Sequence, residues 1–165
     1  MYIRLATESD LSAINAIYNY YVLNSTATYQ IEPSTPDERL AWFHAHDAEH
    51  PVTVVEEESA HGLVILGWGA LSRFHERAAF RQTVEDSVYL HHDYIGRGIG
   101  KLLLVDLIER ARAHGHHTII GVVSAEQTPS LTLHQQLGFV HQGTLTQVGH
   151  KFDRWLDITY LQLTL

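Results

Sequence analysis

The chain has 165 residues, a length that suits one domain with a core of its own, and no linker-like shift in composition divides residues 1–165. Its 11 Lys and Arg against 19 Asp and Glu give a formal net charge of −8, which argues against nucleic acid as a partner. Because the chain has no cysteine, no recognisable signal peptide and no apolar stretch long enough to span a bilayer, we expect a cytoplasmic protein without disulfides, thiol nucleophile or membrane partner.

The first half of the chain alternates helical and strand-like segments. Residues 3–5 predict a short strand, and apolar residues at helical spacing predict a helix that begins near Glu8. The segment STPDERLAWF, residues 34–43, predicts a second helix: Thr35 can cap it, Pro36 suits its first turn, and Glu38 can close a capping box. Residues 52–57, 62–71 and 84–90 are rich in β-branched or aromatic residues and predict three antiparallel neighbouring strands.

The second half begins with YLHHDYIGRGIGKLLL, residues 89–104, which joins a strand to a helix through three glycines. That helix has one apolar face, and Gly115 can end it. A strand at 117–123, a short helix that starts at Thr128 and ends at Gly138, and two strands at 139–148 and 154–163 follow. The pattern predicts an α/β fold with a mixed sheet.

The glycines Gly96, Gly98 and Gly100 place very little side chain where the strand gives way to the helix. Their spacing fits neither the dinucleotide-binding fingerprint nor the P-loop. What remains is a row of backbone N–H groups at a helix N-terminus with Arg97 and Lys101 beside it, an arrangement that can hold a pyrophosphate. For so short a run, a tight turn with a fortuitous basic pair is the alternative.

Longer stretches of sequence help to decide between a pyrophosphate site and a tight turn at these glycines. SVYLHHDYIGRGIGKLLL followed by TPSLTLHQQLGF resembles the core of the GCN5-related N-acetyltransferase (GNAT) superfamily. The stretches IYNYYVLNSTATY, EPSTPDERLAWF, TVEDSVYLHHDY and KFDRWLDITYLQL are most similar to the phosphinothricin and methionine sulfoximine N-acetyltransferases. The resemblance implies a single-domain GNAT fold with a mixed, mostly antiparallel twisted sheet flanked by helices, acetyl-CoA as cosubstrate, and a homodimer.

The resemblance also implies which residues hold acetyl-CoA. The glycine turn would bind its pyrophosphate, and residues 88–90 would line the thioester. A backbone N–H near Leu90, where the strand splays from its neighbour and offers its edge to the pantetheine, would be the oxyanion donor. Two positions depart from the family pattern: Ile95 stands where Gln or Arg is frequent, and Gln127, expected near the pantetheine arm, stands where Asn is usual. The expected cofactor-binding residues are Val88, Tyr89, Leu90, Gly96, Arg97, Gly98, Ile99, Gly100, Lys101 and Gln127.

Transfer to an amine requires a proton acceptor, because amino groups are mostly protonated near neutral pH. Glu85 is the first candidate, and the resemblance places the family's general base at its position; a solvated strand residue or an ion-pair partner is the alternative. Asp86 should face the opposite side of a regular strand, so the two carboxylates need not form a dyad. His134 occupies the place where many relatives carry a tyrosine proton donor, and a packing role for it is equally compatible with the sequence.

Eight of the 13 histidines gather in HAHDAEH at 44–50, at 91–92, and in HGHH at 114–117. No HExxH helix and no cysteine accompanies them. Since direct acetyl transfer needs no metal, we expect solvated or capping histidines and no metal site.

Small acidic amino-acid analogues call for cations and amides in the acceptor pocket. The segment SRFHERAAFRQT, residues 72–83, supplies three arginines just before Glu85, of which one or two should contact substrate. The resemblance places residues 78–80 against the substrate. The expected acceptor-binding residues are Phe74, Arg77, Ala78, Ala79, Phe80, Arg81 and Lys151.

These inferences predict an N-acetyltransferase that moves the acetyl group of acetyl-CoA to the α-amine of a small amino-acid analogue such as methionine sulfone, methionine sulfoximine or phosphinothricin. Without cysteine or a recognisable serine-histidine nucleophile, the transfer should be direct. One alternative keeps this chemistry with a polyamine, an aminoglycoside or a protein N-terminus as acceptor. Another is a non-catalytic module that senses acyl-CoA.

Overall fold

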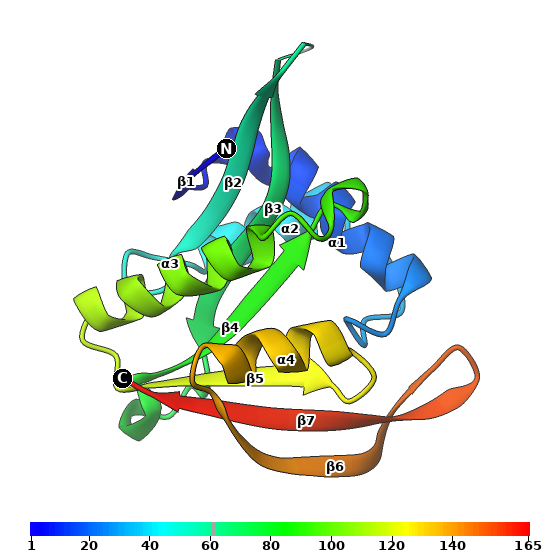
Figure 1. The fold of residues 1–165 in the computed structure, drawn as a ribbon, viewed down its shortest axis with the longest axis vertical. Helices are drawn as coiled ribbons and strands as arrows, with labels where there is room; N and C mark the ends of the chain where they lie inside the picture. Colours follow the sequence, from blue (N-terminus) through cyan, green and yellow to red (C-terminus); the bar gives the residue numbers. More distant parts are fainter. Residues whose placement is uncertain (61) are drawn as a thin grey trace.

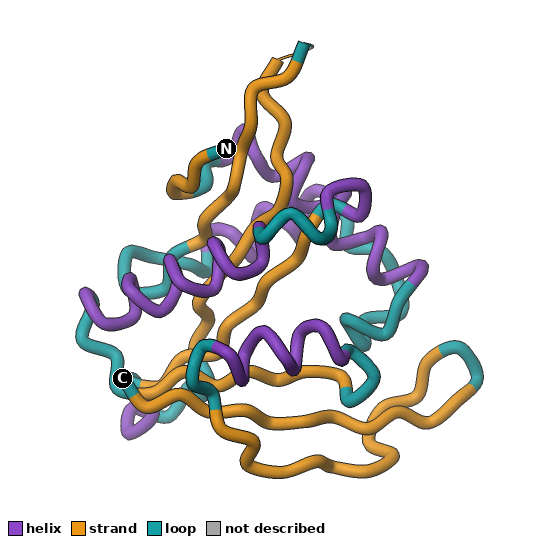
Figure 2. The backbone as a smooth tube through the Cα atoms, viewed as in Figure 1, coloured by secondary structure: helices purple, strands orange, loops and turns teal. Residues whose placement is uncertain are grey.

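The computed structural model describes residues 1–60 and 62–165, which form one seven-stranded sheet with helices on both faces (Figures 1 and 2). The strand order is β1-β2-β3-β4-β5-β7-β6, and all neighbours are antiparallel except β4 and β5. This confirms the predicted mixed, mostly antiparallel sheet. The strands are β1 (Tyr2–Leu5), β2 (Val52–Ser59), β3 (Gly62–Arg73), β4 (Thr83–Leu90), β5 (Thr118–Ser124), β6 (Val140–Lys151) and β7 (Arg154–Thr164).

Four α-helices belong to the described residues, and each begins where the sequence predicts one. The first is preceded by a 3₁₀ turn, Glu8–Asp10, which accounts for the predicted start near Glu8. In the second, Thr35 Oγ1 accepts from the Glu38 N–H at 3.2 Å and the Glu38 carboxylate accepts from the Thr35 N–H at 2.8 Å, so the capping box is confirmed. The helices are α1 (Leu11–Asn24), α2 (Pro36–His44), α3 (Ile99–Ala113) and α4 (Thr128–Gln136).

The helices bury their apolar faces against opposite sides of the sheet. Ile14 and Ile17 of α1 pack on Val54 and Trp68, and Trp42 of α2 joins the same cluster. On the other face, α3 buries a row of leucines, and α3 and α4 lie together on the near side of the sheet in Figure 1. Within residues 1–60 and 62–165, no helix is both long and apolar enough to cross a bilayer.

The two parallel strands, β4 and β5, diverge halfway along β4. Only residues 83–86 of β4 pair with β5, opposite residues 118–121, although β4 continues to Leu90. Figure 1 shows the two arrows diverging from this point. The sheet therefore has an internal gap, bordered by the second half of β4 and by Val122 and Val123 of β5.

Candidate active site

The backbone of β4 presents free amides to this gap. The N–H of His91 donates to the Leu66 carbonyl on β3 at 2.8 Å, and the β3–β4 register runs without a bulge. Because amides of an antiparallel strand alternate in direction, those of Val88 and Leu90 point away from β3, to the side from which β5 has diverged. No described strand pairs with them there. The gap thus offers two backbone donors near Leu90, as the sequence comparison with the GNAT core implied.

The side chains of β4 alternate between two cavities that meet at the gap. Glu85, Ser87 and Tyr89 face α1 and α2 and line a cavity of about 570 Å³, which we call the aromatic cavity. Asp86 and the alternate residues after it face α3 and α4 and line a cavity of about 320 Å³, which we call the glycine-turn cleft. Both cavities are lined by Ala27, Glu85, Ser87, Tyr89 and Val122.

The glycine turn forms the N-terminal end of α3. Gly96 and Gly98 adopt φ of +83° and +80°, left-handed conformations that favour glycine, and a Cβ at either would meet no atom within 4 Å. Gly100 differs, since a Cβ there would lie 3.3 Å from Leu133 of α4. The first two glycines therefore shape an open turn before α3, and the third lets α3 and α4 pack closely.

The expected cofactor-binding residues divide into three groups. Lining the glycine-turn cleft are Val88, Tyr89, Leu90, Gly100 and Gln127. Ile99 is 1% exposed, and its side chain packs in the core and is not available to a ligand. Arg97 is exposed at the turn and pairs with Glu57 at 2.9 Å, while Lys101 is exposed in the first turn of α3.

Both departures from the family pattern lie at the cleft. Ile95 is 60% exposed and lines it with an apolar side chain. Gln127 donates through Nε2 to Thr26 Oγ1 at 3.2 Å and so touches the loop that follows α1. A Gln at this position is thus accommodated by a local hydrogen bond.

Glu85 sits where the two cavities meet. Its side chain is half-buried, and none of the hydrogen bonds of the described residues reaches its carboxylate. Burial, reinforced by the charge of Asp86, raises the pKa of Glu85 above its ordinary value. A half-buried carboxylate with a raised pKa, open to a cavity on both sides, has the properties of a general base.

His134 and Asp86 form a buried pair across the cleft. Nδ1 of His134 lies 2.7 Å from the Ser130 carbonyl and Nε2 lies 3.0 Å from Asp86 Oδ2. Since both neighbours are acceptors, both ring nitrogens must donate, which describes an imidazolium. Burial lowers the pKa of His134, but the hydrogen bond and charge of Asp86 outweigh it and the net shift is upward. Asp86 thus belongs with His134 and not with Glu85, as the strand alternation predicted.

The aromatic cavity contains a residue that the sequence reasoning missed. Arg39 of α2 is only 4% exposed and lines this cavity together with Glu85. Its guanidinium carbon lies 4.6 Å from the ring centroids of both Tyr18 and Trp42. A signal was present, because Arg39 shares a helix face with Trp42 and Phe43, three and four residues on, where a core-facing position is expected.

The residues expected to bind the acceptor lie elsewhere in this chain. Residues 74–81 form an exposed loop before β4, in which Phe74 packs edge-on against Phe80 with centroids 6.0 Å apart. Neither cavity is lined by Phe74, Arg77, Ala78, Ala79, Phe80 or Arg81.

Lys151 also departs from its expected place. Its ammonium is buried and donates to the carbonyls of Ser25 at 2.7 Å and Thr28 at 2.8 Å. This interaction fixes the loop that follows α1, and Ala27 to Gln30 of that loop line the aromatic cavity. The ammonium of Lys151 is thus held by backbone carbonyls, and its predicted contact with an acceptor stays a prediction.

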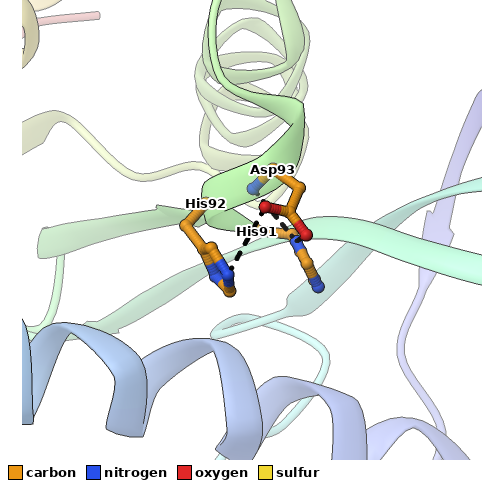
Figure 3. Close-up of side chains that lie close together, drawn as sticks. All are labelled: His91, His92 and Asp93. Carbon is orange, nitrogen blue, oxygen red and sulfur yellow. Dashed lines mark hydrogen bonds and ion pairs between the residues drawn. The ribbon is translucent and has the colours of Figure 1, made fainter.

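One cluster of possible metal ligands follows β4 and consists of His91, His92 and Asp93 (Figure 3). Their ligand atoms lie within 4.8 Å of one another. However, the His91 ring accepts the Asp93 N–H at 3.3 Å, His92 stacks on Tyr20 with centroids 3.9 Å apart, and Asp93 is 70% exposed. These local interactions account for the cluster without an ion, and the expectation of no metal site stays a prediction.

Known proteins resemble this chain over its length. Residues 14–139 match the family described as Acetyltransferase (GNAT) family. L-amino acid N-acyltransferase MnaT of Escherichia coli (strain K12) is 42% identical over 166 aligned positions, which cover 100% of this chain and 94% of that protein. The L-methionine sulfoximine/L-methionine sulfone acetyltransferase of Salmonella typhimurium is 39% identical, with 100% and 95% covered. The crystal structure of a GNAT superfamily phosphinothricin acetyltransferase from Sinorhizobium meliloti in complex with AcCoA has a TM-score of 0.90 at 36% identity, covering 99% of this chain and 88% of that one.

Proposed function

The chain belongs to the GNAT family of acetyltransferases and is an acetyl-CoA-dependent N-acetyltransferase, and we propose that its acceptor is the α-amine of a small L-amino acid or amino-acid analogue. Methionine sulfone, methionine sulfoximine and phosphinothricin are the first candidates, because the similar enzymes are named for them. The observation that carries the proposal is the place of Glu85, at the meeting point of a cavity suited to a small polar molecule and a cleft beside the glycine turn.

The glycine turn and the free edge of β4 fit acetyl-CoA. The amides of the turn and of the N-terminus of α3 can bind the pyrophosphate, since the turn around Gly96 and Gly98 is open. The amides of Val88 and Leu90 can bind the pantetheine arm and the thioester oxygen across the gap. Bound acetyl-CoA supplies the acetyl group as a thioester, which an amine can attack without a covalent enzyme intermediate or a metal ion.

Glu85 is proposed as the general base. An amino acid in the aromatic cavity would present its ammonium to the carboxylate of Glu85, directly or through a water molecule, and lose a proton there. The free amine then faces the gap, behind which lies the thioester. The raised pKa of Glu85, caused by burial and by the charge of Asp86, makes its carboxylate a better proton acceptor than an exposed glutamate.

His134 is proposed as the acid that protonates the departing thiolate. It lines the glycine-turn cleft, and Asp86 keeps its ring protonated. A proton given from Nε2 to the thiolate would leave a neutral imidazole, which solvent protons can recharge. This role would use the proton of the imidazolium, whereas a role in packing alone would not.

The proposal is tested by a screen of amines with acetyl-CoA, read by thiol release. Methionine sulfone, methionine sulfoximine and phosphinothricin should react with a kcat/KM at least about tenfold above that of a polyamine, an aminoglycoside or an N-terminal peptide. Glu85→Gln, prepared in parallel, corrects for uncatalysed hydrolysis. A preference for any of the other three amine classes would contradict the amino-acid assignment.

The oligomeric state is part of the same proposal. We propose a homodimer, and exposed apolar side chains on the β6–β7 hairpin, among them Val148, Phe152 and Trp155 at 55%, 50% and 62%, are consistent with a covered surface. Light scattering that gives the mass of a single chain at assay concentration would contradict it.

A further inference from the structure

Arg39 is a buried cation whose charge is not balanced by an acidic neighbour. It is 4% exposed, and its described hydrogen bond is from Nε to the neutral amide oxygen of Asn15 at 3.1 Å. None of the ion pairs among residues 1–60 and 62–165 includes it. Buried charges are normally paired, so an arginine in this position calls for a partner.

The surroundings hold the guanidinium in place without satisfying it. The rings of Tyr18 and Trp42 lie 4.6 Å from the guanidinium carbon, and Trp68 lies 5.8 Å away. The faces of aromatic rings stabilise a cation that stacks on them. They do not accept hydrogen bonds from the N–H groups that lie in the plane of the guanidinium. The terminal N–H groups therefore remain available to a ligand in the aromatic cavity, which Arg39 lines.

The two carboxylates that line this cavity do not take up the charge. Glu38 accepts the Thr35 N–H at the start of α2 and is exposed, and Glu85 lies on the opposite wall, on β4. Tyr89 lies near both charges: burial raises its pKa, and in addition the Arg39 charge lowers it and the Glu85 charge raises it. The cavity thus presents a cation and an anion to a molecule that enters it.

We propose that Arg39 binds the α-carboxylate of the acceptor and thereby directs its α-ammonium to Glu85. This inference rests on the proposed amino-acid acceptor. An α-amino acid carries a carboxylate and an ammonium on one carbon, which complements Arg39 and Glu85 in one cavity. The planar guanidinium suits a carboxylate, which it can bind through two N–H groups. Arg39 is then a specificity-determining residue that selects amines bearing an adjacent carboxylate.

The experiment compares L-methionine sulfone with its α-carboxamide, which keeps the amine and the side chain but lacks the negative charge. The wild-type protein should prefer the acid, and Arg39→Met, which keeps an apolar stem between the aromatic rings, should lower the acid-to-amide ratio of kcat/KM by about 10²-fold. Using a ratio cancels the different basicity of the two amines, because it is the same in both proteins. The loss should fall on the acid, through a raised KM.

Two further variants complete the test. Arg39→Lys keeps the charge without the planar fork and should recover part of the ratio. Arg112→Met removes an exposed arginine near the end of α3 and should leave the ratio unchanged. Equal losses with acid and amide in Arg39→Met would overturn the inference, because they would show that Arg39 only supports the fold.

The remaining outcomes also decide the question. If Arg39→Met does not fold, inhibition of the wild-type enzyme by the deaminated acid and by its amide replaces it: inhibition by the acid alone supports the carboxylate site, and equal inhibition overturns it. If the wild-type enzyme acetylates amino acids and their amides equally well, the carboxylate site is wrong and the proposed function stands. If it acetylates only other amines, the proposed function fails as well.

Discussion

The burial that raises the pKa of Glu85 suits its proposed role as a base but lowers the stability of the fold when the carboxylate is charged. Its carboxylate is half-buried without a hydrogen-bond donor among the described residues, and burial raises its pKa. Because the folded protein binds this proton more tightly than the unfolded chain, stability falls as pH rises from the ordinary Glu value through the raised one. Above the raised pKa the charged form therefore opposes folding, which is the expected cost of a base held ready for reaction.

Glu85→Gln should change both the turnover and the stability of the protein. The amide cannot accept the proton, so turnover should fall by roughly 10²- to 10⁴-fold, while the affinity for acetyl-CoA should barely change. The wild-type rate should rise with pH as Glu85 ionises, and the variant should lack this rise. At neutral pH the variant should also be at least as stable as wild type in urea. Near-normal turnover in a folded variant would remove Glu85 as the base and turn attention to His134 or a water chain.

Asp86→Asn should lower the pKa of His134. Asp86 raises the pKa of His134 against the opposing effect of burial, so without the charge burial should bring that pKa below its ordinary value. NMR titration of the His134 ring in the wild-type protein and in the variant would measure this. If His134 acts as the acid, turnover of the variant should decline as pH rises through the lowered pKa. An unchanged titration would show that Asp86 does not control the ring.

The sequence offers Glu85 and His134 as candidates because both stand inside recognisable stretches. It does not identify Arg39, nor the partner of His134, because these depend on contacts between segments far apart in the chain: Asp86 and His134 are 48 residues apart. The contacts of Lys151 also could not be predicted from the sequence. A lysine near the end of the chain suggested an available cation, whereas the fold closes three backbone carbonyls around it.

At the scale of elements, periodicity and capping predicted the helices and strands to within a few residues, whereas only the resemblance to the GNAT core implied that β4 splays from its neighbour near Leu90. The alternation of residues along a strand shows which side chains face a core. It does not show where two neighbouring strands stop pairing. The divergence is nevertheless what creates the site, since it frees the amides of Val88 and Leu90 and joins the two cavities.

Gly98→Val should test the start of α3 as an anion site. Gly98 has φ of +80°, which costs a β-branched residue roughly 1–2 kcal/mol, and a new side chain there would project into open space over the amides. Affinity for acetyl-CoA in calorimetric titration should therefore collapse. Gly115→Val is the matched control, because Gly115 has φ of +75° and equal space at the other end of the same helix. Equal affinities in the two folded variants would contradict the assignment of the glycine turn.

The whole molecule is arranged around the gap in its sheet. Strands β1 to β4 lie on one side and β5, β7 and β6 on the other. Apart from the short pairing of β4 with β5, side chains tie the sides together: Lys151 holds the loop after α1, and Tyr29 of that loop donates to Ser124 at 3.0 Å. The glycine-turn cleft is lined by both sides, so a ligand bound there would join them.

Acetyl-CoA should consequently stabilise the chain as one unit. We propose that residues 1–165 form a single domain, so thermal unfolding should show one transition. At about 100 times its dissociation constant, acetyl-CoA should add about 2.7 kcal/mol of stability, which for a chain of this size raises Tm by about 5–10 °C. Gly98→Val should lose most of this shift, whereas Gly115→Val should keep it. Two transitions, of which acetyl-CoA moves only one, would show that the sides of the gap unfold independently and that the ligand does not bridge them.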